Sequence, residues 1–201
     1  MPRISKDEFE AVPLRVHAFL AGVPLHDVWA TDLPHSRTGV TLDEFLRVTT
    51  GTLFAPSPAV RALLNVRFFF GGLFGWDRTT SATTAAETFT DRLTPIDRAR
   101  SLAPAGRKDG LFRVVYRFEN EQLLELINRT AHAAALTALV ETASSYRFYF
   151  AVYVRSVGRL TPLYMALIDP FRKLIIYPSL LRTVRARWEQ TIGSAATESR
   201  G

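Results

Sequence analysis

The chain has 201 residues, which suits one domain with a sizeable core, and its 47% hydrophobic and 22% charged residues exclude general disorder. It contains no cysteine, so disulfides, thiolate catalysis and cysteine-ligated metal sites are excluded. The formal net charge of +6 would suit nucleic acid or an anionic membrane surface. Because the basic residues are spread along the chain and no nucleic-acid motif accompanies them, we expect most of them to lie on solvated surfaces and expect no nucleic-acid partner.

The N-terminal sequence argues against secretion. Its first ten residues, MPRISKDEFE, carry acids where a secretory signal would carry a basic stretch and then an apolar run. No apolar run reaches the roughly 18–20 residues that span a bilayer, so we expect a soluble, cytoplasmic protein. With no internal repeat, residues 1–193 are predicted to form a single domain and residues 194–201 a disordered tail.

The start of the chain predicts a short helix and then a strand. Ser5, with Glu8 three residues later, forms a capping box, and Pro13 should end the helix that it begins. Residues 23–34, VPLHDVWATDLP, combine β-favouring side chains such as Trp29 with a turn-like end, which predicts a strand.

Two further helices are predicted to follow this strand. Thr41 and Glu44 form a second capping box for residues 41–50. Residues 57–70 repeat apolar side chains at helical spacing and run into the aromatic stretch RFFFGGLFGWDR, residues 67–78. We expect its glycines to let the backbone turn inside the protein, where the aromatic side chains fill the core or line a cavity.

The middle of the chain predicts a polar loop and two alternating strands. Residues 78–110 are polar, with one short helix expected after Thr94-Pro95. Residues 111–118 and 146–157 alternate with period two, as half-buried strands of an antiparallel sheet do. In the first, the pattern separates Arg113 and Arg117 from an apolar face of Phe112, Val114, Tyr116 and Phe118. In the second, the apolar face comprises Tyr146, Phe148, Phe150, Val152 and Val154.

The segment 122–141 allows two interpretations. Ala, Leu, Glu and Gln dominate it, so propensity alone favours a helix. As strands it would form residues 122–128 and 130–141, joined near Asn128-Arg129.

The C-terminal third is predicted to be helical. Helix starts are expected at Thr161-Pro162 and at Asp169-Pro170, Pro178 should kink the axis, and Gly193 should end the helix. A helical spacing relates the apolar residues Leu174, Leu181, Val184, Trp188 and Ile192.

His132 is the strongest single candidate for chemistry. In the strand interpretation it shares a face with Ala134, Leu136 and Ala138, whose small side chains leave room for a ligand. A neutral imidazole there could hydrogen-bond the ligand or act as a base, although a hydrogen-bonded structural histidine is the favoured interpretation. Aromatic residues are predicted to line a pocket for an amphipathic molecule, with ordinary core packing as the alternative: Trp29, Trp76, Tyr116, Phe150 and Tyr164.

Other chemistry-bearing residues carry weaker signals. His26 beside Asp27 suggests a base with an orienting carboxylate, but neighbours in a strand point to opposite faces, so we do not expect them to pair. The four histidines show no metal-ligand spacing, and neither a metal nor another cofactor is expected. No catalytic nucleophile or phosphate-loop motif is present, so no catalytic residue is assigned.

Four motifs occur in order between residues 23 and 190. They are Asp27-Val28-Trp29, then Phe74-Gly75-Trp76-Asp77, then Asn128-Arg129-Thr130-Ala131-His132, and a closing stretch from Tyr164-Met165 through Pro170-Phe171-Arg172 to Tyr177-Pro178. Together they resemble a bacterial domain-of-unknown-function family with the pattern D-V-W, L-G-W-D, N-R-T-x-H and Y-M-x-x-I-x-P-F-R-x-x-I-x-Y-P. Phe74 in place of leucine and the alanine-rich stretch after His132 depart from that pattern.

That family is similar to the START-like, polyketide-cyclase-like (SRPBCC) superfamily, so the resemblance implies an α+β helix-grip fold. In this fold a curved antiparallel sheet wraps around a long C-terminal helix, with two short helices after the first strand. The resemblance therefore favours strands over residues 122–141, which propensity did not. It implies a cavity between sheet and helix but no particular reaction.

The expected function is binding of a small hydrophobic or amphipathic ligand between the sheet and the C-terminal helix. One alternative is a cyclase- or dehydratase-type enzyme on the same scaffold, with His132 or a pocket tyrosine as acid–base. Another is a membrane-surface or protein-interaction module that uses the basic C-terminal helix. A homodimer is a candidate assembly, and whether any reaction is catalysed stays open.

Overall fold

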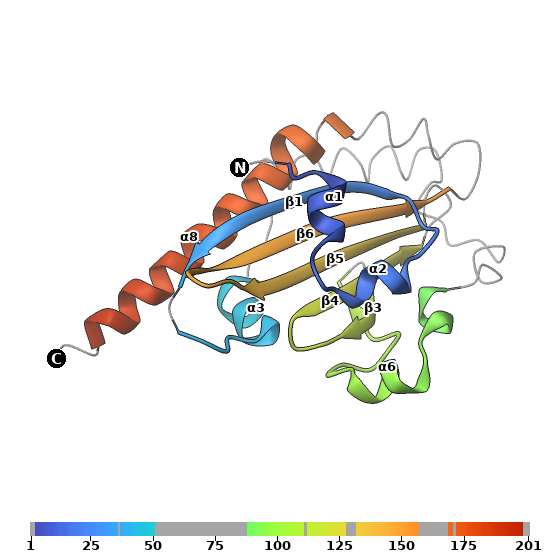
Figure 1. Ribbon diagram of the computed structural model, residues 1–201, viewed down its shortest axis with the longest axis horizontal. Coiled ribbons are helices and arrows are strands. Elements are labelled where there is room, and N and C mark those ends of the chain that lie inside the picture. Colours follow the sequence, from blue (N-terminus) through green and yellow to red (C-terminus); the bar gives the residue numbers. More distant parts are fainter. Residues whose placement is uncertain are drawn as a thin grey trace.

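The centre of the molecule is a curved six-stranded antiparallel sheet with the strand order β1-β6-β5-β4-β3-β2 (Figure 1). The structure is a computed structural model that describes residues 3–35, 37–50, 88–110, 112–127, 132–156, 169–170 and 172–198, with the backbone alone for 50, 172 and 193–198. The strands are β1 Leu25–Pro34, β2 Lys108–Asp109, β3 Phe112–Arg117, β4 Glu121–Ile127, β5 His132–Glu141 and β6 Ser145–Arg155.

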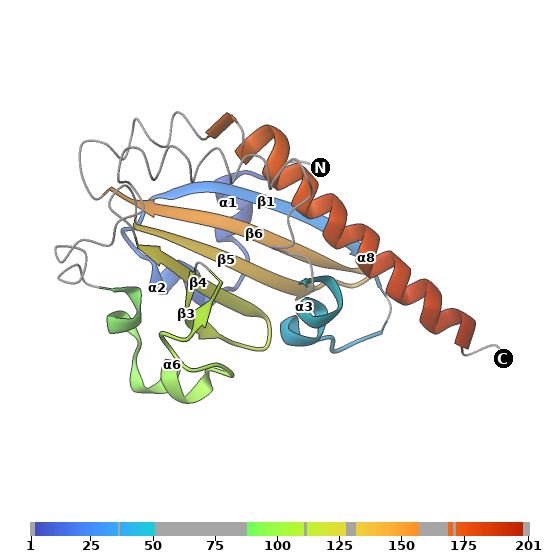
Figure 2. The same cartoon turned by 180° about the vertical axis from the view of Figure 1, so that it is seen from behind.

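Helices cover both faces of this sheet. Figures 1 and 2 show α1 and α2 in front of one face, and α3 and α8 in front of the other. The helical elements are α1 Lys6–Glu10, α2 Arg15–Phe19, α3 Leu42–Thr50, η1 Phe89–Arg92, α6 Pro95–Arg100, η2 Arg172–Ile176 and α8 Tyr177–Glu198. We call the two sides of the sheet the α2 face and the α8 face. The arrangement is an α+β fold of the helix-grip kind, as predicted.

Within the ambiguous segment 122–141, the described residues form strands β4 and β5, so the strand interpretation that the resemblance favoured is confirmed there and the helical one is wrong. β5 pairs with β6 along its whole length, and with β4 on its other side from His132 to Ala138. Tertiary packing overrides helix propensity because both faces of the segment are buried. Leu123 and Leu136 join the core on the α2 face, whereas Leu139 joins the core on the α8 face.

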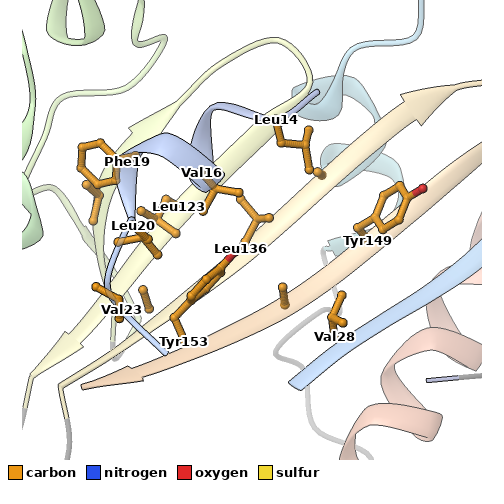
Figure 3. Packing of buried hydrophobic residues seen from close by; sticks show 14 of the residues in the cluster. Leu14, Val16, Phe19, Leu20, Val23, Val28, Leu123, Leu136, Tyr149 and Tyr153 are labelled. Atoms are coloured by element: carbon orange, nitrogen blue, oxygen red, sulfur yellow. The ribbon is translucent and has the colours of Figure 1, made fainter. Parts of the chain in front are cut away.

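The alternation predicted for β6 is confirmed, but the strand is not half-buried. Tyr146, Phe148, Phe150, Val152 and Val154 all pack on the α8 face. On the α2 face, Tyr149, Ala151 and Tyr153 are buried as well (Figure 3). The second face is covered because α1, α2 and η1 contribute Phe9, Val16, Phe19 and Phe89 to the same core.

The face assignment predicted for β3 is wrong. Its pairing with β4 shifts register between Val114 and Tyr116, which marks a β-bulge. The extra residue places Val114 and Tyr116 in different cores, on opposite faces of the sheet. The prediction assumed strict alternation of side chains along the strand, which does not allow for a bulge. One inserted residue moves every following side chain of the strand to the opposite face.

The helix starts predicted at Ser5, Thr41 and Thr94 are confirmed. Ser5 Oγ accepts a hydrogen bond from the backbone N–H of Glu8 at 3.1 Å, and Thr94 Oγ1 accepts one from Asp97 at 3.1 Å. Thr41 Oγ1 accepts from Glu44 at 3.3 Å. The helix expected over residues 57–70 and the aromatic stretch 67–78 lie outside the described residues.

The C-terminal helix differs from expectation at both ends. A π-helical turn, η2, precedes α8, and Pro178 lies in the first turn of α8. Leu174, within this wider turn, is 76% exposed, whereas Leu181, Val184 and Trp188 of the predicted apolar series are buried in the core on the α8 face. Gly193 does not end α8, which continues to Glu198, since one glycine costs only about 1 kcal/mol inside a helix. Among the helices of the described residues, none has the length and apolar character that a membrane crossing requires.

Candidate ligand-binding face

One row of side chains crosses the middle of the α8 face. The antiparallel register places Trp29 of β1 opposite Phe150 of β6, and Phe150 opposite Thr137 of β5. Side chains of directly opposed residues lie on the same face of a sheet. We call these three residues the central row.

An aromatic side chain of α8 covers one end of the central row. The ring of Tyr177 lies with its centroid 5.7 Å from that of Trp29 and 5.3 Å from that of Phe150. Tyr177 is itself buried. The three rings form an apolar contact between sheet and helix, with the indole of Trp29 at its edge.

Two polar atoms of the central row are buried without a hydrogen-bond partner among the described residues. They are the indole Nε1 of Trp29 and the hydroxyl Oγ1 of Thr137. Leaving a buried donor or acceptor unpaired costs about 1–3 kcal/mol, so native proteins keep few such groups without a use for them. The two residues are two strands apart, about 10 Å, with the Phe150 ring between them. A ligand oxygen could accept from Trp29, and the Thr137 hydroxyl could donate or accept.

Beyond the central row, the next residue across the sheet is hydrogen-bonded. Gln122 of β4 lies opposite Thr137, and its side-chain oxygen accepts from Nε of Arg117. Nη1 of Arg117 donates in turn to Oδ1 of Asp43 on α3 at 2.9 Å. The unsatisfied groups of the row are therefore those that flank Phe150.

The α8 face is less completely covered than the α2 face. Around the central row, side chains of β5 and β6 keep 6–9% of their surface exposed: Ala135, Thr137, Phe150 and Val152. Their sequence neighbours on the α2 face keep only 0–5%: Ala134, Leu136, Ala138, Tyr149, Ala151 and Tyr153. Towards α3 the cover is complete, because Phe148 is fully buried against Phe45. The residual exposure therefore surrounds the unsatisfied groups.

A charged cluster lies beside this face, at the start of β1. Nε2 of His26 lies 2.9 Å from Oδ1 and 3.0 Å from Oδ2 of Asp169, which immediately precedes Pro170. The same nitrogen lies 3.6 Å from Oδ2 of Asp27. Nζ of Lys173 lies 2.7 Å from Asp169 and 3.8 Å from Asp27. We call these four residues the His26 cluster.

The expectation that His26 and Asp27 cannot approach each other is wrong. The pairing of β1 with β6 shifts register between Leu25 and Asp27, so His26 lies at a β-bulge. Leu25 packs with the α2-face core, whereas Asp27 precedes Trp29 by two residues on the α8 face. The bulge removes the strict alternation on which that expectation depended.

His132 lies on the α2 face, away from the central row. Its Nε2 lies 2.6 Å from Oε1 of Glu125, which also accepts a hydrogen bond from the backbone N–H of Phe89. The Phe89 ring stacks over the imidazole at 4.1 Å, and the His132 side chain is 3% exposed. This environment is that of a hydrogen-bonded structural histidine.

Tyr116 also lies on the α2 face, within a buried acidic network. Its hydroxyl donates to Oε1 of Glu121 at 3.0 Å. Burial raises the pKa of Glu121 to about 7, against the opposing hydrogen bond from Tyr116. Burial, together with the Glu121 carboxyl, raises the pKa of Tyr116. Nearby, Arg15 binds Asp97 through two hydrogen bonds of 3.0 Å, which lower the pKa of that carboxyl to about 2.

The structure thus brings together only part of the predicted pocket. Trp29 and Phe150 lie side by side on the α8 face, whereas Tyr116 and His132 lie on the other face. The predicted residues Trp76 and Tyr164 lie outside the described part of the chain. Sequence reasoning did not assign Thr137 to any site and marked Asp169 only as a helix start, because their places in these sites depend on register and on contacts across the fold.

Two surface hollows lie away from the central row. One of about 370 Å³ lies beside α6 and is lined by Leu93, Arg98, Ser101, Leu102, Ala103, Pro104 and Ala105. The other, of about 310 Å³, lies between the N-terminal helices and β6, where His17 and Tyr153 contribute polar atoms. Neither has a residue of the central row in its lining.

Comparison with known proteins identifies a family but no activity. A family model described as "Protein of unknown function (DUF2867)" matches residues 19–179, which include all six strands. No curated protein and no solved structure matches the chain. Because the matched region is well over half of the 201 residues, the chain belongs to the DUF2867 family of proteins of unknown function.

Proposed function

We propose that the protein binds a small, largely apolar molecule carrying at least one oxygen acceptor between its sheet and α8. The observation that carries the proposal is the indole N–H of Trp29, a buried donor without a partner among the described residues. It adjoins two aromatic rings and lies where the face keeps residual exposure. Apolar burial would drive binding, and the hydrogen bond to Trp29 would orient the guest.

A matched pair of tryptophan substitutions tests this proposal. Trp29→Phe removes the unpartnered N–H but keeps an aromatic ring. Trp188→Phe is the control, because Nε1 of Trp188 already donates to the backbone oxygen of Pro34 at 2.9 Å. The probe is anilinonaphthalene sulfonate, whose fluorescence reports an apolar site, combined with mass spectrometry of organic extracts of each purified protein.

The two substitutions should differ in their effect on binding. Trp29→Phe is expected to weaken probe binding about tenfold, the loss expected for one hydrogen bond in a site without water. Any co-purifying molecule should be absent from this variant. Trp188→Phe is expected to leave binding unchanged while it lowers stability by about 1 kcal/mol. Equal binding by wild type and Trp29→Phe, with no molecule in either extract, would contradict the proposal.

The strand order supports a finer family assignment. We infer that the DUF2867 domain belongs to the START-like superfamily, as the sequence resemblance implied. Strand β1 pairs with the last strand, β6, and the long C-terminal helix α8 packs against β1 and α3. Nothing in this arrangement favours a cyclase or dehydratase reaction over binding, because His132 is buried beneath Phe89.

A second candidate function is peripheral attachment to an anionic membrane. Leu174, 76% exposed, and its neighbour Ile175 form an apolar tip directly before α8. On the α8 surface, the exposed residues Arg182, Arg185 and Arg187 supply positive charge. Apolar insertion with basic flanks is the pattern of interfacial binding.

Co-sedimentation with vesicles tests this second candidate. Wild type should bind vesicles of phosphatidylcholine with phosphatidylglycerol, and Leu174→Ser should reduce binding several-fold. Leu102→Ser, at a leucine that is 59% exposed beside α6, should not change it. Absence of binding together with a dimer in light scattering would instead assign the apolar tip to a second copy of the chain.

A further inference from the structure

Three metal-ligating side chains from distant parts of the sequence meet in the His26 cluster. Nε2 of His26 lies 2.9 Å from Oδ1 of Asp169 and 3.6 Å from Oδ2 of Asp27. Ligand atoms of all three residues lie within 4.8 Å of one another. Ligands of a tetrahedral zinc ion are separated by about 3.3 Å when each bond measures 2.0–2.1 Å. The distances from His26 to Asp169 and to Asp27 lie on either side of this value. Rotation of the partly exposed Asp169 side chain would adjust the distance between the two carboxylates.

A cation already contacts both carboxylates of this arrangement. Nζ of Lys173 lies between the two carboxylates, 2.7 Å from Asp169 and 3.8 Å from Asp27. Arg3 adds a second positive charge at 3.6 Å from Asp27, from the exposed side of the cluster. Because the Asp27 side chain is fully buried, a positive charge beside it offsets an otherwise large desolvation cost.

We propose that His26, Asp27 and Asp169 form a binding site for a divalent transition-metal ion such as Zn²⁺, and that the Lys173 ammonium takes the place of the ion when no metal is bound. The Lys173 side chain is 32% exposed, and its long aliphatic stem lets the ammonium turn out into water. The metal would then replace one positive charge by two.

The ligand set selects the class of metal. One imidazole and two carboxylates suit Zn²⁺ and related transition-metal ions, whereas Mg²⁺ and Ca²⁺ prefer oxygen ligands alone. Among the described residues, these three ligands would leave a fourth coordination position to be filled. Since His26 and Asp169 are both partly exposed, that position would face solvent, where water or an anionic group could complete the coordination. This site is separate from the central row and does not depend on the ligand proposed there.

Metal titration of the purified full chain tests the proposal. Calorimetry with zinc chloride near pH 7 should show one ion per chain, and cobalt(II) chloride should give the visible absorption bands of a low-symmetry site. His26→Gln and Asp169→Asn should each weaken zinc binding by at least roughly tenfold, since even residues that only support a metal ligand cost about 10–100-fold. Lys173→Met should tighten binding about fivefold, the factor expected when one partly exposed ion pair no longer competes.

An exposed histidine elsewhere provides the control. His35 lies 3.2 Å from Glu141, a pair that could bind zinc adventitiously. Because His35 is not part of the proposed site, His35→Gln should leave the zinc affinity unchanged. Thermal melts without metal would verify that each variant is folded. If Asp169→Asn does not fold, His26→Gln alone tests the site, because His26 is partly exposed and its substitution should be tolerated. Zinc binding that survives both His26→Gln and Asp169→Asn would overturn the site. An affinity unchanged in Lys173→Met would overturn the role given to the lysine.

Discussion

Replacing Glu121 by Gln should remove most of the pH dependence of stability between about pH 4.5 and 7. The Glu121 side chain is fully buried on the α2 face, and the Tyr116 hydroxyl donates to its Oε1. Burial raises the pKa of this carboxyl from 4.5 to about 7. Within that window the folded protein keeps a proton that the unfolded chain releases, so stability falls as pH rises.

The magnitude follows from the two pKa values. Each pKa unit corresponds to about 1.4 kcal/mol, so raising the pH from 4.5 to above 7 should cost the wild type about 3 kcal/mol of unfolding free energy. Glutamine keeps an oxygen that accepts from Tyr116 and cannot ionise. Glu121→Gln should therefore match the wild type near pH 4.5 and exceed its stability by up to about 3 kcal/mol at pH 8.

Urea denaturation followed by tryptophan fluorescence at pH 4.5, 6 and 8 measures this difference. Glu119→Gln is the matched control, because Glu119 is exposed two residues away and should show no such trend. Ionisation of Asp97 does not interfere, since its pKa is lowered to about 2 and its contribution changes below about pH 4. A stability difference between Glu121→Gln and wild type that stays constant with pH would refute the reasoning.

Three further predictions concern the two faces of the sheet. Asp97→Asn breaks the bidentate pair with Arg15 and should lower the free energy of unfolding by about 1 kcal/mol at pH 7. The loss should be much smaller at pH 2, where the wild-type carboxyl is itself becoming protonated, and denaturation at both pH values checks this. Leu181→Ala should lower stability by about 3 kcal/mol, because Leu181 of α8 is fully buried against the sheet. Leu174→Ala should change stability by less than about 0.5 kcal/mol, because Leu174 is 76% exposed. Equal losses in thermal melts of the two variants would contradict this packing of α8. Thr137→Val removes the unpartnered hydroxyl and should raise the stability of the ligand-free protein by about 1 kcal/mol while weakening probe binding; a loss of stability would mean that the hydroxyl has a partner.

Local features of the fold followed from short stretches of sequence. The caps at Ser5 and Thr94 were predicted because each depends on a side chain and a backbone N–H three residues away. The alternation of β6 was equally accessible, since it reflects which side chains avoid water on each face. Nothing in the local sequence, however, indicated that α1 and α2 would bury the second face as well.

The candidate sites depended on contacts that no local pattern contains. Trp29 and Phe150 were predicted as pocket residues, but Thr137 joins them only through the register of β5 against β6. The bulge at His26 lies next to Asp169, 143 positions further along the chain, and turns a pair that alternation would separate into a cluster.

The sequence by itself determined where helices begin, which segments alternate and where aromatic side chains concentrate, because these properties depend on neighbours within one turn or a few residues of strand. Only the tertiary structure decided, against local helix propensity, that β4 and β5 are extended, and which faces the side chains beside each bulge occupy. The reason is that a single bulge or one wider helical turn costs little locally. Burial of whole faces against distant segments therefore selects among these alternatives, and with them the composition of both sites.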